Sequence, residues 1–132
     1  MGYYILMVFA YRDDKKPIKG RVYVLRITLQ DSTVVHKIGM CFTPRSADRM
    51  MEILRSWFMA YRYIPETRLR LDYETDDPKG LESYIHGQLA EFKWVPDKKV
   101  DGHQEMFKGL DEEVVIDFIK TVRKEKLVWV PQ

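Results

Sequence analysis

The spacing of apolar residues changes several times along the chain, and each change predicts a new element of secondary structure. A continuous apolar run from Tyr3 to Tyr11 ends in a charged segment, which predicts a buried strand followed by a loop. Between Arg21 and Gly39, two runs rich in β-branched and aromatic residues flank a short polar loop and predict a β-hairpin. Alternation in its first strand predicts one face that lies mostly in the core, formed by Tyr23, Leu25, Ile27 and Leu29.

The hairpin carries two proton-bearing side chains, Tyr23 and Lys37, among apolar neighbours. Directly opposed residues of a hairpin point to the same face, so these two share a face only if the loop has an odd number of residues. A three-residue loop would satisfy this condition. The polar segment 30–33 permits such a loop without requiring it.

Helical spacing begins after Thr43 and Pro44, which suit the N-cap and the first position of a helix. The apolar stripe of this helix consists of Ala47, Met50, Met51, Leu54, Trp57, Phe58 and Tyr61. A second helix starts within the segment 76–78. Its core stripe is Leu81, Ile85, Leu89 and Phe92. Glu82 and His86 lie one turn apart just beside that stripe.

Three further elements follow from the pattern. Residues 68–74 alternate and predict a half-exposed strand, residues 104–107 predict a short strand, and a last helix opens at the acidic residues 111–113. The apolar side of this last helix consists of Val114, Val115, Phe118, Ile119 and Val122. The tail 127–130 either adds an edge strand or packs on the core.

These elements predict an α+β fold, in which two to three helices flank a small, mostly antiparallel sheet built on the hairpin and the strand 68–74. At 132 residues the chain is long enough for one core and too short for two, so we expect a single domain over residues 1–132. Its motif core spans residues 20–107. The strand 3–11, which extends the sheet, and the helix 111–124 are extensions of that core.

Composition narrows the class of protein. With 45% hydrophobic and 32% charged residues, the chain suits a packed globular protein. Cys41 is the single cysteine, which excludes an internal disulfide framework and a CxxC site and favours a reducing, cytoplasmic setting. The longest apolar run, Tyr3 to Tyr11, is far shorter than the roughly 20 residues needed to cross a bilayer, so we expect no membrane association.

Charge is unevenly distributed, although the formal net charge is only +2. Thirteen Lys and Arg against six Asp and Glu give residues 1–70 a charge of +7, whereas nine against fourteen give residues 71–132 a charge of −5. Such polarity can mark a phosphate-facing surface beside a carboxylate-bearing one. The alternative is that the two halves of the sequence interleave in space.

Five short motifs contain the residues with the most chemical potential. In chain order they are Val22-Tyr23, Lys37-Ile38-Gly39, Arg49, Glu82 with His86, and Gly102-His103-Gln104-Glu105-Met106-Phe107. Their order resembles the GIY-YIG nuclease superfamily, and most closely its phage ORF-172 DNA-binding branch, whose second motif reads Lys-Ile-Gly. The resemblance covers about residues 20–107 and implies a GIY-YIG-like fold, nuclease activity, DNA as the partner and a phage or bacterial cytoplasmic setting.

The chain departs from the better-known pattern of this superfamily in three places. The first motif reads Arg21-Val22-Tyr23 and keeps only the tyrosine. Lys37 stands where the second motif has a tyrosine, and no asparagine takes the place of a late asparagine. The lysine is similar to that of the ORF-172 branch.

Hydrolysis of a phosphodiester requires a base for the attacking water, positive charge beside the transition state and usually a metal held by carboxylate oxygen. By resemblance, Tyr23 deprotonates or orients the water, Lys37 acts on that phenol or contacts phosphate, and Arg49 binds the transition-state oxygens. Glu82 holds one Mg²⁺ or Mn²⁺ ion, a hard cation that prefers oxygen ligands, with His86 as a nearby proton carrier. A phenol keeps its proton at neutral pH, so Tyr23 needs a neighbouring cation to act as a base.

Each candidate also has a purely structural interpretation. Tyr23 suits a core tyrosine with a hydrated hydroxyl, Lys37 a strand lysine with its head in solvent, and Arg49 a helix-surface residue in an ion pair. Glu82 and His86 suit a hydrogen-bonded pair on a helix surface.

Two further residues compete for these roles. Arg45 lies nearer the positive end of the first helix than Arg49, although Arg49 matches the spacing of the family better. His36 directly precedes Lys37 and points to the opposite face of its strand, so it ranks below His86 as a site residue.

The leading hypothesis is a metal-dependent DNA endonuclease of the GIY-YIG type. Its site residues are Tyr23, Lys37, Arg49, Glu82 and His86. The alternative is a DNA-binding module on the same scaffold, catalytically weak or inactive, that grips phosphates. Its binding residues are Lys37, Arg45, Arg49 and Arg55. A third hypothesis is a small protein-interaction domain that forms a homodimer through its tail 127–132.

Overall fold

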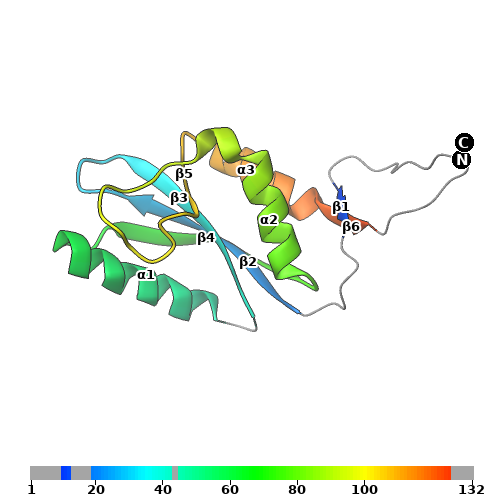
Figure 1. Ribbon diagram of the computed structural model, residues 1–132, viewed down its shortest axis with the longest axis horizontal. Coiled ribbons are helices and arrows are strands. Elements are labelled where there is room, and N and C mark those ends of the chain that lie inside the picture. The colour runs from blue at the N-terminus through cyan, green and yellow to red at the C-terminus, as the bar shows by residue number, and fades with distance from the viewer. Residues whose placement is uncertain (1–9, 13–18, 43–44, 126–132) are drawn as a thin grey trace, which may run out of the picture.

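The computed structural model describes residues 10–12, 19–42 and 45–125. Its elements are β1 (Ala10–Arg12), β2 (Gly20–Thr28), β3 (Val34–Cys41), α1 (Ser46–Tyr61), β4 (Glu66–Thr75), α2 (Pro78–Gln88), the 3₁₀ helix η1 (Ala90–Phe92), β5 (Met106–Lys108), α3 (Glu112–Thr121) and β6 (Arg123–Glu125). Figure 1 shows the helices arranged around a central sheet. This α+β architecture confirms the fold class expected from the sequence.

The central sheet has four antiparallel strands in the order β4-β2-β3-β5. In the β2–β3 hairpin Tyr23 lies opposite Gly39, so Tyr23 and Lys37 share a face. The N–H of Leu29 donates to the carbonyl of Thr33 at 2.8 Å and closes a loop of three residues. The odd loop length that the sequence permitted is therefore present.

β1 and β6 form a separate parallel pair. The sequence predicted that a strand over 3–11 would extend the main sheet, but residues 10 and 11 pair with β6 instead. The predicted tail strand 127–130 and the rest of the 3–11 run lie outside the described residues. The last helix is also shorter than the predicted range 111–124, because α3 ends at Thr121 and the next strand, β6, begins at Arg123. Pairing between segments so distant in sequence leaves no local signal.

Helices cover both faces of the central sheet (Figure 1). α1 and the segment 94–106 pack on the face that carries Tyr23 and Leu25. α2 and α3 pack on the other face, where Val22 and Val24 are also buried. The sheet thus has two core faces, while the sequence alone identified the Tyr23 face.

The first helix differs most from its prediction. α1 begins at Ser46, and the expected start at 43–44 lies outside the described residues. Its fully buried apolar side chains are Ile53 and Trp57, and Met51 of the predicted stripe is 61% exposed. Other exposed members of that stripe are Ala47 and Phe58. The predicted stripe left out Ile53, and its members Met50 and Tyr61 are only partly buried against this core.

A β-bulge alters the register of β4. Leu71 and Leu69 pair with consecutive residues of β2, which leaves Arg70 as the additional residue. Leu71 is buried and Leu69 is exposed, whereas alternation had placed both on one face. The Arg70 guanidinium reaches Glu112 on α3 at 3.0 Å.

α2 and α3 begin where the sequence predicted, each with an aspartate as N-cap. Asp77 accepts from the Gly80 N–H at 3.1 Å, and Asp111 accepts from the Val114 N–H at 3.3 Å. Of the predicted α2 stripe, Leu81, Ile85 and Leu89 are buried, whereas Phe92 is partly buried and lies on η1, because α2 ends at Gln88. On α3 the sequence placed Val114 on the apolar side and left out Ile116, but Ile116 is buried and Val114 is exposed.

Glu112, at the start of α3, ties this helix to three strands of the sheet. Its carboxylate accepts from His36 at 3.1 Å, from Arg70 at 3.0 Å and from Arg26 at 3.4 Å. Partial burial acts to raise the pKa of Glu112, but the hydrogen bonds from His36 and Arg70 lower it overall. The ion cluster therefore stabilises the folded state mainly while Glu112 is charged.

We expect Glu112→Gln to lower the free energy of unfolding at neutral pH by about 1–3 kcal/mol, because three donors lose a charged acceptor. The pKa of Glu112 lies below its ordinary value of 4.5 in the folded protein. Its stabilisation is therefore complete above that value and disappears as the pH falls through the lower, folded pKa. Urea unfolding should separate the two proteins at neutral pH and bring them together in strong acid.

Glu113→Gln is the matched control for Glu112→Gln, because the Glu113 side chain is 74% exposed and has one ion pair, at 3.7 Å. A loss of stability in Glu113→Gln as large as in Glu112→Gln would contradict the assignment.

Candidate functional site

The candidate site lies where the short strand β5 stops covering the edge of β3. β5 pairs with residues 35–37 of β3. It begins at Met106, two residues after the start of the strand predicted over 104–107. The next residue of β3, Ile38, lies beyond this pairing. Its backbone N–H donates to the Glu105 carbonyl at 3.1 Å. Its carbonyl accepts from Nε2–H of His86 at 2.7 Å. Side chains from β3, α2 and the turn before β5 converge here.

Lys37 is 0% exposed, so the interpretation as a strand lysine with its head in solvent is wrong. Its Nζ forms an ion pair with the Glu105 carboxylate and donates to the Tyr23 hydroxyl at 3.4 Å. The same nitrogen lies 5.2 Å from the centre of the Tyr23 ring. Tyr23 is thus a core tyrosine whose hydroxyl faces a cation.

The Lys37 side chain occupies space that is free because residues 39 and 102 are glycines. A Cβ atom on Gly39 would collide with the Lys37 ammonium and the Tyr23 hydroxyl, and one on Gly102 would collide with the Lys37 side chain. Gly102 also has a φ of 71°, in the left-handed region that favours glycine. The glycine of the Lys-Ile-Gly motif therefore allows Tyr23 and Lys37 to meet.

Arg49 approaches Tyr23 from α1. Partial burial acts to lower the pKa of Arg49, but its interactions with the Tyr23 hydroxyl and with the Glu52 carboxylate raise it overall. Glu52 also pairs with Arg45, at 3.2 Å. The structure therefore places two cations, Lys37 and Arg49, beside one phenol oxygen.

Glu82 is half-buried on α2 and makes no hydrogen bond or ion pair with the part of the chain that the structure describes. Burial, and then the negative charge of Glu105, raise the pKa of Glu82 to about 7, although Lys37 opposes the shift. The pairing of Glu82 with His86 on the helix surface is not formed, since His86 binds the edge of β3. Burial lowers the pKa of His86, which the Ile38 carbonyl and Glu105 only partly oppose.

Glu105 is the member of this cluster that sequence reasoning did not assign. It lies within the late motif 102–107 and acts on both Lys37 and Glu82. The signal available in the sequence was its place in that motif, between two segments with turn and strand character. The structure brings it together with Tyr23, Lys37, Arg49, Glu82 and His86 through the contacts above.

A family model for the T5orf172 domain matches residues 20–123. The chain belongs to the T5orf172 domain family. This finding confirms the ORF-172 branch of the resemblance, and the matched range contains every residue of the cluster. Searches of curated proteins and of solved structures found no match. No helix in the described part of this T5orf172 domain is long and apolar enough to span a membrane.

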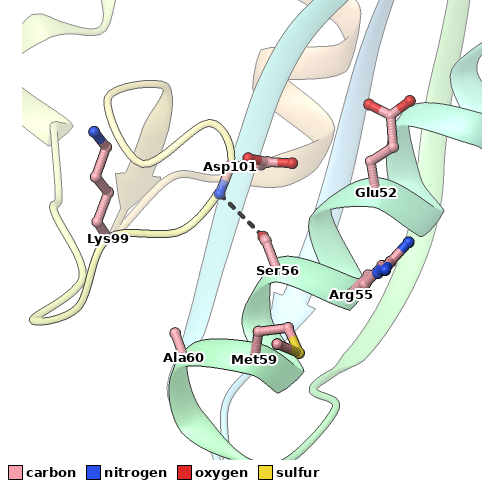
Figure 2. Close-up of a pocket in the computed structure, with 7 residues that line it drawn as sticks. All are labelled: Glu52, Arg55, Ser56, Met59, Ala60, Lys99 and Asp101. Carbon is pink, nitrogen blue, oxygen red and sulfur yellow. Dashed lines mark hydrogen bonds between the residues drawn. The ribbon is translucent and has the colours of Figure 1, made fainter.

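A pocket of about 630 Å³ opens beside the cluster, between α1 and the segment 99–101. Its lining residues are Glu52, Arg55, Ser56, Met59, Ala60, Lys99 and Asp101. Figure 2 shows α1 along one side and the loop along the other, joined where the Asp101 N–H donates to the Ser56 hydroxyl at 3.0 Å. Arg55 and Lys99 form no ion pair with described residues, whereas Arg45 pairs with Asp48 and Glu52. Within the described residues the pocket therefore has two cations without an ion pair, together with the carboxylates of Glu52 and Asp101.

The residues that could hold a metal in this T5orf172 domain are carboxylates. Among the described residues, no three His, Cys, Asp or Glu side chains are grouped closely enough to enclose an ion. Glu82 nevertheless fits a hard cation, because its unpartnered oxygens are half-buried and a positive charge would offset the effects that raise its pKa. Mg²⁺ keeps several water ligands, so one carboxylate can suffice.

Proposed function

We propose that this T5orf172 domain is a divalent-metal-dependent DNA endonuclease of the GIY-YIG type. The observation that carries the proposal is the cluster itself, in which two cations approach one phenol hydroxyl near a carboxylate without a partner. Membership of a nuclease-like, DNA-binding family supports it. Phosphodiester hydrolysis needs this combination of a proton acceptor, positive charge and an oxygen ligand for a metal.

The positions of the side chains suggest a role for each. Tyr23 takes a proton from the attacking water or orients it, because its hydroxyl lies 3.4 Å from the Lys37 ammonium. The Tyr23 residue is 0% exposed, so water reaches this hydroxyl only when neighbouring side chains move. Arg49 is the cation that binds the phosphate oxygens, since its side chain is 31% exposed and Lys37 is buried. His86 has its Nε2–H engaged with β3, so a proton-carrier role falls to Nδ1.

Glu82 is the residue that would hold Mg²⁺ or Mn²⁺. When bound, such an ion stabilises the negative charge that develops on the phosphate. Glu82 would hold the ion in its carboxylate form, although burial and Glu105 raise its pKa to about 7.

The direct test is incubation of the purified protein with supercoiled plasmid or branched DNA in Mg²⁺, in Mn²⁺ and in EDTA. We expect nicked or linear products in the metal buffers and none in EDTA. Absence of cleavage with either metal would overturn the proposal. A gel shift that persists in EDTA, without cleavage, would favour the alternative of a catalytically inactive binding module.

Arg55 and Lys99 are expected to contact the DNA backbone beside the site. Replacing both with alanine should weaken DNA binding about ten-fold and reduce the slope of log affinity against log salt by about two, as expected for two lost phosphate contacts. Fluorescence anisotropy over a series of salt concentrations measures both quantities. The matched control removes two exposed lysines from the helices on the other face, Lys79 and Lys120. An equal change of slope in the control would contradict the assignment.

A further inference from the structure

The buried ammonium of Lys37 depends on a residue outside the predicted site. Among the described residues its polar neighbours are the Glu105 carboxylate and the Tyr23 hydroxyl. The hydroxyl is neutral and 3.4 Å away, so Glu105 supplies the counter-charge. A buried ammonium without a counter-charge either loses its proton or moves towards water. Glu105 thus holds the Lys37 side chain inside the protein.

Backbone contacts hold Glu105 beside Lys37. Its N–H donates to the Gly102 carbonyl at 2.9 Å, and its carbonyl accepts from the Ile38 N–H at 3.1 Å. The following residue, Met106, pairs with Lys37 across β3 and β5. Backbone contacts therefore hold the turn before β5 against strand β3 on both sides of the ion pair between Lys37 and Glu105.

We propose that Glu105 is a positioning residue, which fixes the Lys37 ammonium against the Tyr23 hydroxyl and leaves the substrate to other side chains. This inference deepens the proposed function and rests on it. It also assigns Lys37 to the phenol, because the ammonium is already paired with Glu105 and lies 3.4 Å from the Tyr23 hydroxyl. Two cations thus act on Tyr23, the buried Lys37 and Arg49, whose side chain is 31% exposed.

The first test is a double-mutant cycle with isosteric, uncharged replacements. Glu105→Gln should lower the single-turnover cleavage rate about 10–100-fold, as expected for a residue that orients a functional group. The Kd for DNA, measured in EDTA, should change by less than about two-fold, since Glu105 makes no substrate contact. In the Lys37→Met background, at a metal concentration that saturates Glu82, Glu105→Gln should lower the rate far less than it does in wild type, since only its effect on Glu82 remains. The proposal would be overturned if the loss of rate in the double variant equalled the product of the losses in the two single variants. A large change in the Kd for DNA would also overturn it.

Charge, rather than shape, should be what matters at position 105. Glu105→Asp retains the carboxylate and should recover part of the rate lost in Glu105→Gln. Glu91→Gln, an exposed glutamate of η1, is the matched control and should behave as wild type. A Glu105→Asp protein as slow as Glu105→Gln would contradict an electrostatic role.

A second measurement needs no cleavage. Acetic anhydride attacks neutral, accessible amines, and peptide mass spectrometry reports the acetylation of Lys37. Wild type and Glu91→Gln should be protected, whereas Glu105→Gln should be labelled, because its Lys37 side chain moves towards water and becomes accessible to the reagent. If wild type never cleaves DNA but Glu105→Gln exposes Lys37, the proposed function fails and the positioning contact stands. Protection of Lys37 in folded Glu105→Gln would overturn the positioning role.

Circular dichroism establishes that each variant is folded before labelling. Should Glu105→Gln not fold, Glu105→Asp takes its place in both measurements. Its shorter carboxylate should give partial labelling of Lys37 and a partial loss of rate. A fully protected and fully active Glu105→Asp would then overturn the proposal.

Discussion

Replacement of Glu82 by glutamine should reduce metal-dependent DNA cleavage by about 100–1000-fold, the effect of removing one group that stabilises charge in a transition state. The same change should make the metal-free protein more stable above neutral pH. Both effects have one cause, which is that Glu82 is a half-buried carboxylate without a partner among the described residues. Its charge destabilises the folded protein, and the same charge is available to bind a cation. Plasmid cleavage and urea unfolding in EDTA measure the two effects.

The pH dependence of this stability follows from the direction of the shift. Glu82 has a folded pKa of about 7 against an ordinary value of 4.5, because burial and Glu105 disfavour its charged form. Wild type should therefore lose stability relative to Glu82→Gln as the pH rises through this interval, and the difference should reach about 2 kcal/mol at alkaline pH. In acid, where both side chains are neutral, the two proteins should be alike.

Glu91→Gln controls for removal of a carboxylate elsewhere on the surface and should change neither cleavage nor the pH profile of stability. The role of Glu82 would be rejected if Glu82→Gln cleaved DNA as well as wild type. The account of its burial would be rejected if the variant gained no stability at alkaline pH.

Tyr23→Phe should lower the cleavage rate by about 100- to 10,000-fold, the range typical of a lost general base. Only the hydroxyl oxygen is removed, so the ring should keep its packing against Leu25 and Trp57. DNA affinity should be retained, because Arg49 and the cations of the pocket remain. Single-turnover cleavage and fluorescence anisotropy separate these two quantities.

Tyr73→Phe is the matched control for the loss of a tyrosine hydroxyl, since Tyr73 lies on the neighbouring strand β4 and packs against the other core face. Equal losses of rate in Tyr23→Phe and Tyr73→Phe would point to a general effect of the substitution. A Tyr23→Phe protein with wild-type kinetics would remove the phenol from the mechanism.

Local chemistry was enough to predict much of the fold. The aspartate caps and apolar stripes placed α2 and α3 because a helix start and a helical face depend on residues a few positions apart. The predicted face of α1 was too wide, since how much of an apolar stripe is buried depends on the neighbour that packs against it. The bulge at Arg70 and the parallel pairing of β1 with β6 likewise depend on distant partners.

The candidate site shows the same division. The order of the motifs selected Tyr23, Lys37, Arg49 and Glu82, and the structure brings them together. The order of the motifs did not single out Glu105, because the importance of this residue depends on an ion pair with Lys37, 68 positions earlier in the chain. The sequence offered Arg45 as a rival to Arg49, and the structure places Arg49 beside the phenol, whereas Arg45 pairs with Asp48 and Glu52.

The sequence by itself determined the hairpin, the types of the later helices and strands, and the set of candidate residues for the proposed phosphodiester chemistry. Each of these depends on spacing and side-chain type along a short stretch of chain. Only the tertiary structure decided that Lys37, which looks like a surface lysine, is wholly buried between Tyr23 and Glu105. The physical reason is that burial and charge neutralisation are properties of all the segments that surround a group, and those segments meet only in the folded chain.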